Sequence, residues 1–253
     1  MIELEVSAAC DIGCVRENNE DMILVGECFL RNESYTTPVE LGSKDRFLFA
    51  IADGMGGHNS GEVASSISLH NLQFFFNDIP SGLTASGFNE SIVDWLESIN
   101  NIIDSKGLVD KIYKGMGTTL VGIAYYNGDF YSMNCGDSRL YRYRDGNLCQ
   151  MTTDHSLDNM MGVEKHSSII TNCIGGGCKS SYIDIVQMTH DIHEGDVYLL
   201  CSDGLSDMMS NHHIATKLAE GSNARALCDE AIALGGLDNI SVCKIEVKRI
   251  FEE

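Results

Sequence analysis

The sequence is poor in proline and in basic residues. Only 2 of its 253 residues are proline, and 37 acidic residues stand against 17 Lys and Arg, for a net charge of −20. Nucleic acids and anionic membranes attract clustered Lys and Arg, so this balance argues against both as partners. With so little proline and no low-complexity linker, we expect residues 1–253 to form a single domain.

Long hydrophobic runs are also missing. No stretch approaches the 18 or so apolar residues of a membrane span. The N-terminal segment "MIELEVSAACDIG" has no basic start followed by an apolar core, so we expect no signal peptide. We therefore predict a cytoplasmic protein that binds no membrane. We also expect a monomer.

None of the ten cysteines forms a C-x-x-C pair, and several lie within apolar runs. Buried free thiols behave as small hydrophobic groups, so we expect a reduced protein without a disulfide framework. His190 and His193 form H-x-x-H, and Cys173 and Cys178 are five apart. Neither spacing matches a standard zinc site, which argues against structural zinc.

The hydrophobic pattern predicts strands and helices in alternating groups. Asn127-Gly128, Gly136-Asp137 and Asp145-Gly146 separate short strands and indicate antiparallel hairpins. The polar segment Arg31–Arg46 is expected to be a surface loop. The arrangement indicates an α+β fold built as a layered sandwich. The expected helices carry these apolar stripes: Val63, Ile67 and Phe74; Ile92, Leu96, Ile99 and Ile103; Ala224, Leu227, Ala231 and Leu234.

Acidic residues stand where several of these strands meet loops. The apolar runs "FLFAIADG" and "DVYLLCSDG" both end in Asp-Gly. Acidic residues also come directly before "MILV" and, with one Asn between, before "ISV". Side chains at such positions can converge from different strands. The candidates are Glu20, Asp21, Asp53, Asp203 and Asp238.

Converging carboxylates repel one another unless a cation separates them. Oxygen ligands without His or Cys favour Mg²⁺ or Mn²⁺. Gly54 leaves its carbonyl open as a further ligand. Two such ions about 3.5–4 Å apart can activate a water for attack on phosphorus. Arg16, five residues before Asp21, could pair with a phosphate through its planar guanidinium.

Seven motifs stand in order along the chain. They are "DIGCVRENNED" (11–21), "ADGMGGHNSGEVAS" (52–65), "GTTLVGIAY" (117–125), "NCGDSRLY" (134–141), "TTDHS" (152–156), "CSDGLSD" (201–207) and "DNISV" (238–242). Together they resemble the motifs of the metal-dependent, type 2C serine/threonine protein phosphatases. The resemblance runs from about Val6 to Val247, and the D-G-M-G-G-H form is typical of bacterial members.

The resemblance implies a four-layer α-β-β-α sandwich with two central, mainly antiparallel sheets. It implies two tightly bound Mn²⁺ or Mg²⁺ ions, a third weaker one, and direct attack of a metal-bound water on phosphoserine or phosphothreonine. Substrates would be phosphoproteins of a cognate kinase. The implied metal ligands are Glu20, Asp21, Asp53 (bridging), Gly54, Asp137 (third ion), Asp203 and Asp238. Arg16 would bind the substrate phosphate, and Thr118 and Asp154 would be structural.

Two departures from the family pattern limit what the resemblance implies. The first is at the position of the His proposed as general acid in animal members, and the second, flap length, bears on substrate choice. Met55 stands where animal members carry a His, and His58 lies three residues on. The flap segment, residues 156–174, is short for a bacterial member. It has Asn172-Cys173 where an Arg is common.

Three rival interpretations remain open. The chain could be a pseudophosphatase that acts as a binding module, although no metal-binding Asp is missing. It could act on small phosphate esters, given the short flap. Cys10 and Arg16 also have the C-x₅-R spacing of cysteine phosphatases, but Asp11 and the acidic residues that follow disfavour a thiolate there.

Overall fold

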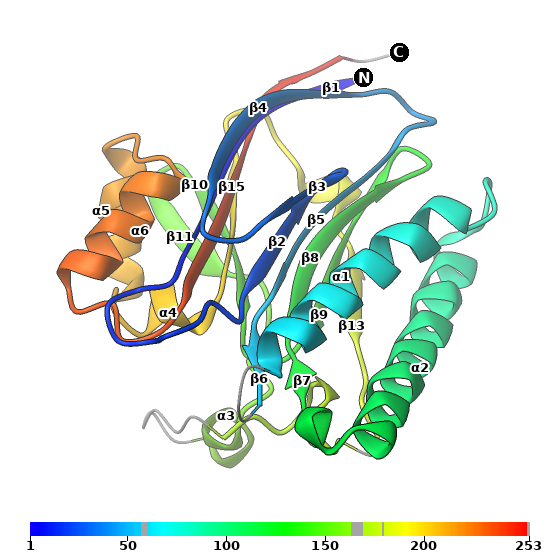
Figure 1. The fold of residues 1–253 in the computed structure, drawn as a ribbon. Helices are drawn as coiled ribbons and strands as arrows, with labels where there is room; N and C mark the ends of the chain where they lie inside the picture. The colour runs from blue at the N-terminus through cyan, green and yellow to red at the C-terminus, as the bar shows by residue number, and fades with distance from the viewer. Residues whose placement is uncertain (57–59, 163–168, 179, 252–253) are drawn as a thin grey trace.

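In the computed structural model, two six-stranded sheets face each other and helices cover both outer surfaces (Figure 1). The structure describes residues 1–56, 60–162, 169–178 and 180–251. One cluster of buried apolar side chains fills the space between the sheets, and two others lie between a sheet and its helices. The predicted α-β-β-α sandwich is confirmed.

The first sheet joins the two ends of the chain. Its strands follow the order β11-β10-β14-β15-β1-β4, and every neighbouring pair is antiparallel. The long pairing of β1 with β15 joins two of its interior strands. The strands are β1 (Ile2–Asp11), β4 (Ser34–Leu41), β10 (Arg139–Arg144), β11 (Asn147–Gln150), β14 (Val197–Cys201) and β15 (Ile240–Ile250).

The second sheet has the order β13-β9-β8-β5-β2-β3 and is also antiparallel throughout. A small third sheet, β12-β7-β6, continues from the ends of β5 and β8. The strands are β2 (Met22–Val25), β3 (Cys28–Leu30), β5 (Arg46–Ala52), β8 (Leu120–Tyr126), β9 (Asp129–Cys135), β13 (Asp184–Gln187), β6 (Gly54–Met55), β7 (Gly117–Thr118) and β12 (Ile174–Gly175).

The helices divide between the two faces. Helices α1 and α2 cover the second sheet, and α5 and α6 cover the first (Figure 1). They are α1 (Gly61–Asp78), α2 (Ala85–Val109), α3 (Leu157–Met161), α4 (Asp203–Ser206), α5 (Asn211–Ala219) and α6 (Ala224–Ala233), with 3₁₀ turns η1 (Lys111–Tyr113) and η2 (Thr189–Asp191). Among the described residues, no helix is both long enough and apolar enough to cross a bilayer.

The apolar stripe predicted for α2 is buried as expected, and Trp95 beside it is buried too. In α1 the prediction was partly wrong, because Phe74 is 70% exposed. The buried face of α1 is built from small residues and Leu69, Leu72 and Phe76. Three consecutive phenylalanines cannot all face one side of a helix, and Phe76 takes the core position.

The prediction of a surface loop over Arg31–Arg46 was wrong. Residues 34–41 form β4, which pairs with β1 at the edge of the first sheet. Alternate side chains of β4 face solvent, which explains the polar composition. Pro38 is compatible with this place, because an edge strand leaves one row of backbone groups unpaired.

Two predicted hairpins are confirmed, and one turn differs. Asn127-Gly128 joins β8 to β9 and Asp145-Gly146 joins β10 to β11, all four residues having positive φ. Gly136-Asp137 follows β9 in the second sheet but precedes β10 in the first. The segment therefore crosses between sheets instead of closing a hairpin. This crossing brings Asp137 to the same end of the sandwich as the ends of β5 and β14.

Candidate metal centre

Asp53 lies between β5 and β6, where the second sheet continues into the small third sheet. Its backbone is fixed from both sides. The Asp53 N–H donates to Thr119 Oγ1 at 3.1 Å, and its carbonyl accepts from the Thr118 hydroxyl at 2.8 Å. The carbonyl also accepts from the Thr119 N–H at 2.8 Å. Thr118 thus supports the backbone of Asp53, as predicted for a structural residue.

Both Asp-Gly pairs need glycine for close packing. A Cβ at Gly54 would lie 2.2 Å from the carbonyl oxygen of Gly61, at the start of α1. A Cβ at Gly204 would lie 2.0 Å from the carbonyl oxygen of Asn239. Such distances are far inside van der Waals contact. The glycines therefore let each Asp-Gly pair approach a neighbouring backbone segment. This packing role is independent of any ligand role of the Gly54 carbonyl.

Glu20 and Asp21 precede β2 and are held by four backbone contacts. The Glu20 N–H donates to Asn239 Oδ1 at 2.8 Å, and the Glu20 carbonyl accepts from Ser65 Oγ at 2.5 Å. Arg31 Nε donates to the Asp21 carbonyl at 2.8 Å. The Asp21 N–H donates to Asn19 Oδ1 at 3.0 Å. These contacts fix the backbone from which both carboxylates project.

The Glu20 carboxylate also meets the first turn of α1. Its Oε1 accepts from the Gly61 N–H at 3.2 Å. A helix N-terminus carries partial positive charge and favours a carboxylate there. Burial nevertheless raises the pKa of Glu20, and the Gly61 hydrogen bond offsets only part of this effect.

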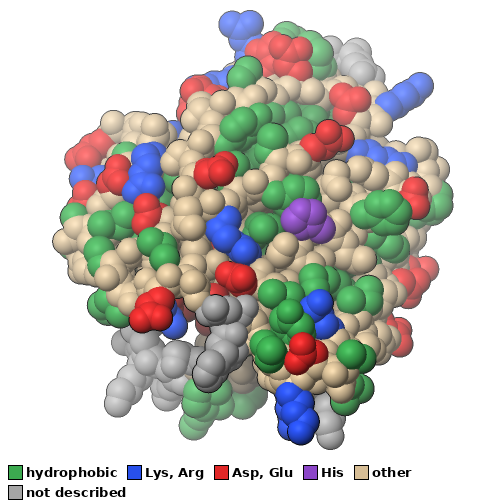
Figure 2. Space-filling view, viewed as in Figure 1, with side chains coloured by type: hydrophobic (Ala, Val, Ile, Leu, Met, Phe, Trp, Pro, Cys, Tyr) green, Lys and Arg blue, Asp and Glu red, His purple; other side chains and the backbone are tan. Residues whose placement is uncertain are grey.

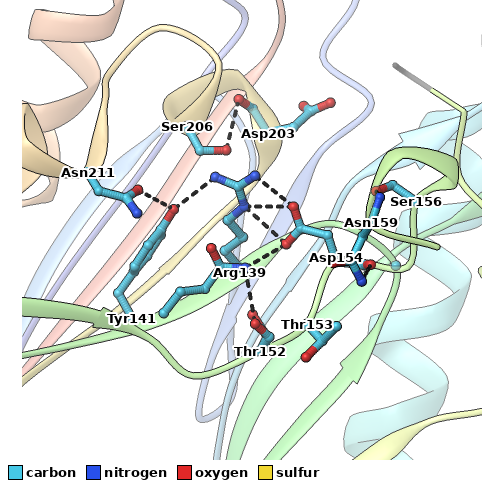
Figure 3. Close-up of polar contacts among 12 residues, drawn as sticks. Arg139, Tyr141, Thr152, Thr153, Asp154, Ser156, Asn159, Asp203, Ser206 and Asn211 are labelled. Atoms are coloured by element: carbon cyan, nitrogen blue, oxygen red, sulfur yellow. Dashed lines mark hydrogen bonds and ion pairs between the residues drawn. The ribbon is translucent and has the colours of Figure 1, made fainter. Parts of the chain in front are cut away.

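Asp203 begins α4 directly after β14, and an ion pair lies beside it (Figure 3). The Arg139 guanidinium donates to both carboxylate oxygens of Asp154, from Nε to Oδ1 at 3.1 Å and from Nη2 to Oδ2 at 2.6 Å. The Tyr141 hydroxyl accepts from Arg139 Nη1 and donates to Asn211 in α5. Asp154 therefore fastens the segment after Asp137, which fits the structural role expected for it.

The acidic side chains perturb one another strongly. Burial, then the charges of Asp21 and Asp203, raises the pKa of Asp53 well above its ordinary value. Burial, with the charges of Asp137 and Asp238, raises the pKa of Asp203 to about 8. Burial also raises the pKa of Asp21 to about 6 and that of Asp137 to about 6. The fold thus assembles negative charge that the described residues do not neutralise.

Asp238 is the exception, because it has a cationic partner. Arg16 Nη2 donates to Asp238 Oδ2 at 2.6 Å. The hydrogen bond to Asp238 raises the pKa of Arg16, and the charges of Glu20 and Asp53 act in the same direction. The Arg16 side chain is 51% exposed, so its guanidinium lies at the solvent edge of the acidic group.

The donor atoms suit a hard cation. Among the described residues, the buried Oδ1 atoms of Asp21, Asp137 and Asp203 have no hydrogen-bond partner. In the same part of the chain, no three His, Cys, Asp or Glu side chains are gathered closely enough to hold a metal ion as they stand. These oxygens are therefore available to a ligand and lie in one region of the fold. They are not gathered closely enough to form a complete coordination shell. The residues fit a carboxylate-bound divalent ion.

The sequence interpretation overlooked three residues that shape the site. Arg31 connects the Asp21 carbonyl to α1, where it donates to the Glu62 carbonyl and to Ser65 Oγ. Asn239 connects Glu20 to the carbonyls of Ile12 and Asn18. The position of Asn239 beside Asp238 in "DNISV" was a usable signal, whereas Arg31 gave none.

The third overlooked residue is His155, which is 5% exposed. Its Nδ1 accepts from the Gly136 N–H at 3.0 Å and contacts Asn172 Nδ2 at 2.8 Å, while Nε2 contacts Asp184 Oδ2 at 2.9 Å. Asn172 also bonds to the backbone of Tyr182. Asn172, at the position where family members often have Arg, therefore fixes the end of the flap segment. His58 and residues 163–168 of that segment lie outside the described residues.

The geometry around Cys10 does not indicate a nucleophile. The thiol is 1% exposed. Burial, and then the charge of Asp21, raises its pKa to about 11. Its sulfur accepts from Asn19 Nδ2 and Ser241 Oγ, both at 3.2 Å. No hydrogen bond joins Cys10 to Arg16 among the contacts described, and the guanidinium faces Asp238 instead.

Comparison with known proteins places the chain in a family. The family model described as protein phosphatase 2C matches residues 37–230. The serine/threonine protein phosphatase PstP of Mycobacterium tuberculosis is 31% identical over 96% of this chain. The chain belongs to the protein phosphatase 2C family. It spans 45% of the length of that mycobacterial relative.

Solved structures of protein phosphatase 2C relatives share the fold. The Streptococcus agalactiae serine/threonine phosphatase has a TM-score of 0.81 and 30% identity, over 97% of this chain and 100% of that one. The catalytic domain of PstP, solved in complex with two manganese ions, has a TM-score of 0.74 and 30% identity. That match covers 98% of this chain and 100% of that one.

Proposed function

We propose that this chain is a metal-dependent phosphoprotein phosphatase that hydrolyses phosphoserine and phosphothreonine. The observation that carries the proposal is the group of mutually repelling carboxylates around Asp53. It includes buried oxygens of Asp21, Asp137 and Asp203 that lack hydrogen-bond partners. Membership of the protein phosphatase 2C family, and the two manganese ions of PstP, support divalent cations as the missing counter-charge.

We assign the ligand roles by position. Asp53 would contact both ions, with the Gly54 carbonyl as a further donor. Asp203 and Asp238 would complete one ion, and Glu20 and Asp21 would hold the other largely through waters. When bound, the two ions supply Lewis acidity that lowers the pKa of a water for attack on phosphorus. The chain's own part is to fix the ligand backbones through Thr118, Thr119, Asn239 and Arg31.

Arg16 is proposed to bind the substrate phosphate. Its guanidinium lies at the solvent edge of the acidic group, and it is the cation that pairs with Asp238. Bidentate binding of phosphate suits its planar geometry. To serve both roles, Arg16 would exchange the Asp238 carboxylate for phosphate oxygens as Asp238 turns to a metal ion.

Asp137 is proposed to support protonation of the leaving group. Its carboxylate lies near Asp203, whose pKa it raises. A third, weaker cation held by these two carboxylates would supply the acidity needed to protonate the leaving group. Met55 in this chain cannot donate a proton, which leaves that task to another group.

The substrates are proposed to be phosphorylated proteins of a cognate serine/threonine kinase. Lys and Arg side chains are scattered among acidic ones on the face seen in Figure 2, without a continuous basic surface for nucleic acid. A monomeric state and a cytoplasmic location are part of the proposal, to be checked by light scattering and by cell fractionation. The short flap segment keeps small phosphate esters as the second candidate substrates.

A substrate panel with and without metal tests the proposal. Phosphoserine and phosphothreonine peptides should be hydrolysed in Mn²⁺ or Mg²⁺, faster than small phosphate esters at equal concentration. A chelator should remove the activity, and added Mn²⁺ should restore it. Binding of phosphopeptide with no turnover in any divalent ion would favour the pseudophosphatase. Faster turnover of small esters would favour the second candidate, and full activity in chelator would falsify the mechanism.

A further inference from the structure

Two cysteine thiols meet beside the small third sheet. The Sγ atoms of Cys173 and Cys178 lie 3.2 Å apart, closer than two sulfur atoms in ordinary van der Waals contact. Cys173 is 3% exposed, whereas Cys178 is partly exposed. Both are free thiols in this structure. Their spacing of five residues did not fit a zinc site, and the structure gives the pair a different meaning.

The backbone between the two cysteines is built to turn back on itself. Gly175, Gly176 and Gly177 all have positive φ, at 70°, 62° and 82°. The Cys178 N–H donates to the Gly175 carbonyl at 3.0 Å, which closes the turn. A Cβ at Gly176 would lie 2.7 Å from Cys173 Sγ. Glycine is therefore required there for the thiols to face each other.

We propose that Cys173 and Cys178 are a reversible oxidation site that forms an intramolecular disulfide with a peroxide oxidant. The Cys178 thiolate attacks the peroxide, an S–O bond forms as the O–O bond breaks, and hydroxide leaves. Cys173 then attacks the oxidised sulfur of Cys178, the S–S bond forms, and the S–O oxygen leaves as water. Overall, two thiols are oxidised and one hydrogen peroxide is reduced to two waters.

The order of the two steps follows from the surroundings of the thiols. Cys178 is the more exposed of the pair and can meet the oxidant. Burial raises the pKa of Cys173, as it does that of Cys135 nearby. A buried thiol with a raised pKa is slow to react with an oxidant in solution but can attack a sulfur that already touches it. Cys173 is therefore the resolving thiol.

Disulfide formation would reach the metal centre through the third sheet, an effect that rests on the proposed function. Ile174, next to Cys173, pairs with Thr118 of β7, and Thr118 pairs with Gly54 of β6. The Thr118 hydroxyl holds the Asp53 carbonyl at 2.8 Å. A disulfide needs its sulfurs at about 2.05 Å, so the thiols must close by roughly 1.1 Å from 3.2 Å.

If β12 takes up part of this closure, the backbone that positions Asp53 would shift with it. Displacement of catalytic groups by about 1 Å can lower a rate by up to ~100-fold. We expect oxidation to reduce turnover by roughly ten-fold within that range. Reduction of the disulfide should restore the rate. The pair would then make the phosphatase responsive to oxidants.

The test uses the full chain with the exposed thiols removed. Cys14 and Cys149 are exposed, and Cys14→Ser/Cys149→Ser prevents their cross-linking between molecules. This background is treated with hydrogen peroxide, alkylated, and digested for mass spectrometry. The peptide that holds both Cys173 and Cys178 should lose two hydrogens and escape alkylation. Activity on an aryl phosphate in Mn²⁺ should fall and return with a thiol reductant.

Two variants complete the design. Cys178→Ser should abolish both the mass change and the loss of activity. Cys28 is a partly exposed thiol in β3, so Cys28→Ser is the matched control. It should respond to hydrogen peroxide as the Cys14→Ser/Cys149→Ser background does. Sulfinic acid at Cys178 with Cys173 alkylated would overturn the proposal. A disulfide that leaves turnover unchanged would overturn its coupling to the metal centre. If the reduced protein is inactive in Mn²⁺, the proposed function fails, while the mass change still decides whether the disulfide forms.

Discussion

Arg16 and Asp238, 222 positions apart in the sequence, form an ion pair with an Nη2–Oδ2 distance of 2.6 Å. The pair joins the residue proposed to bind phosphate to a residue proposed to bind metal. Both side chains are partly exposed, at 51% and 35%, so the pair contributes little to stability. The pair matters to the proposed function, because each partner is assigned a second role there.

Arg16→Ala should separate these roles. We expect kcat/KM for a phosphopeptide to fall by about 10–100-fold, because a hydrogen bond to a charged group contributes about 1.5–3 kcal/mol. Mn²⁺ should bind at least as tightly as before, because a cation that competes for Asp238 is gone. Steady-state kinetics and calorimetry measure the two effects. Arg142→Ala, in a surface ion pair with Asp191, is the control. Unchanged kinetics with weakened Mn²⁺ binding would contradict the assignment.

Asp203→Asn should weaken metal binding without unfolding the protein. In chelator above pH 8, where Asp203 is ionised, its melting temperature should be no lower than that of the natural chain, because the change removes one of several repelling charges. The natural chain should gain about 2.7 kcal/mol at 100 Kd of Mn²⁺, and the variant much less. Turnover should drop by several orders of magnitude. Thermal unfolding with chelator or Mn²⁺ measures this.

Asp94→Asn makes the same charge change on the exposed side of α2 and should leave both the Mn²⁺ effect and turnover intact. Equal Mn²⁺ stabilisation of Asp203→Asn and the natural chain would refute Asp203 as a ligand.

Asp137→Ala should affect the substrates unequally. Phosphoserine and phosphothreonine peptides release an alkoxide that needs a proton, whereas an activated aryl phosphate releases a weakly basic phenolate. We expect the peptide rate to fall by at least about ten-fold more than the aryl rate. Calorimetry should still find two tightly bound Mn²⁺ ions. Equal losses on both substrates, or loss of the tight pair, would speak against the role given to Asp137.

Cys10→Ser should keep most of the turnover. The thiol is buried and its pKa is raised to about 11, so almost no thiolate exists near neutral pH. Serine can still accept from Asn19 and Ser241, and we expect a loss of stability of about 1 kcal/mol. Vanadate should inhibit the natural chain poorly. Loss of activity in a folded Cys10→Ser protein would return the cysteine mechanism to consideration.

Local patterns were enough for the fold class and for most of the acidic group. The α2 stripe is buried as predicted, because a helix face repeats at a spacing that the sequence displays. Asp53 and Asp203 could be recognised because an apolar strand that ends in a carboxylate and a glycine is a local feature. The structure adds that both glycines also serve close packing.

Contacts between distant segments were beyond the sequence. The polar segment 34–41 forms the strand β4 because β1 supplies its backbone hydrogen bonds. The composition of the segment does not reveal this pairing. The passage of Gly136-Asp137 between sheets depends on where β9 and β10 find their neighbours.

The sequence by itself determined the chemistry available to this protein: carboxylates at strand ends that no His or Cys accompanies, and an arginine near them. Only the tertiary structure decided which groups meet. It placed Arg16 on Asp238, left oxygens of Asp21 and Asp203 without partners, and set two thiols 3.2 Å apart. The physical reason is that the sequence pattern around a residue indicates whether its side chain is buried. Its ion-pair and hydrogen-bond partners come from segments that approach only when the sheets pack.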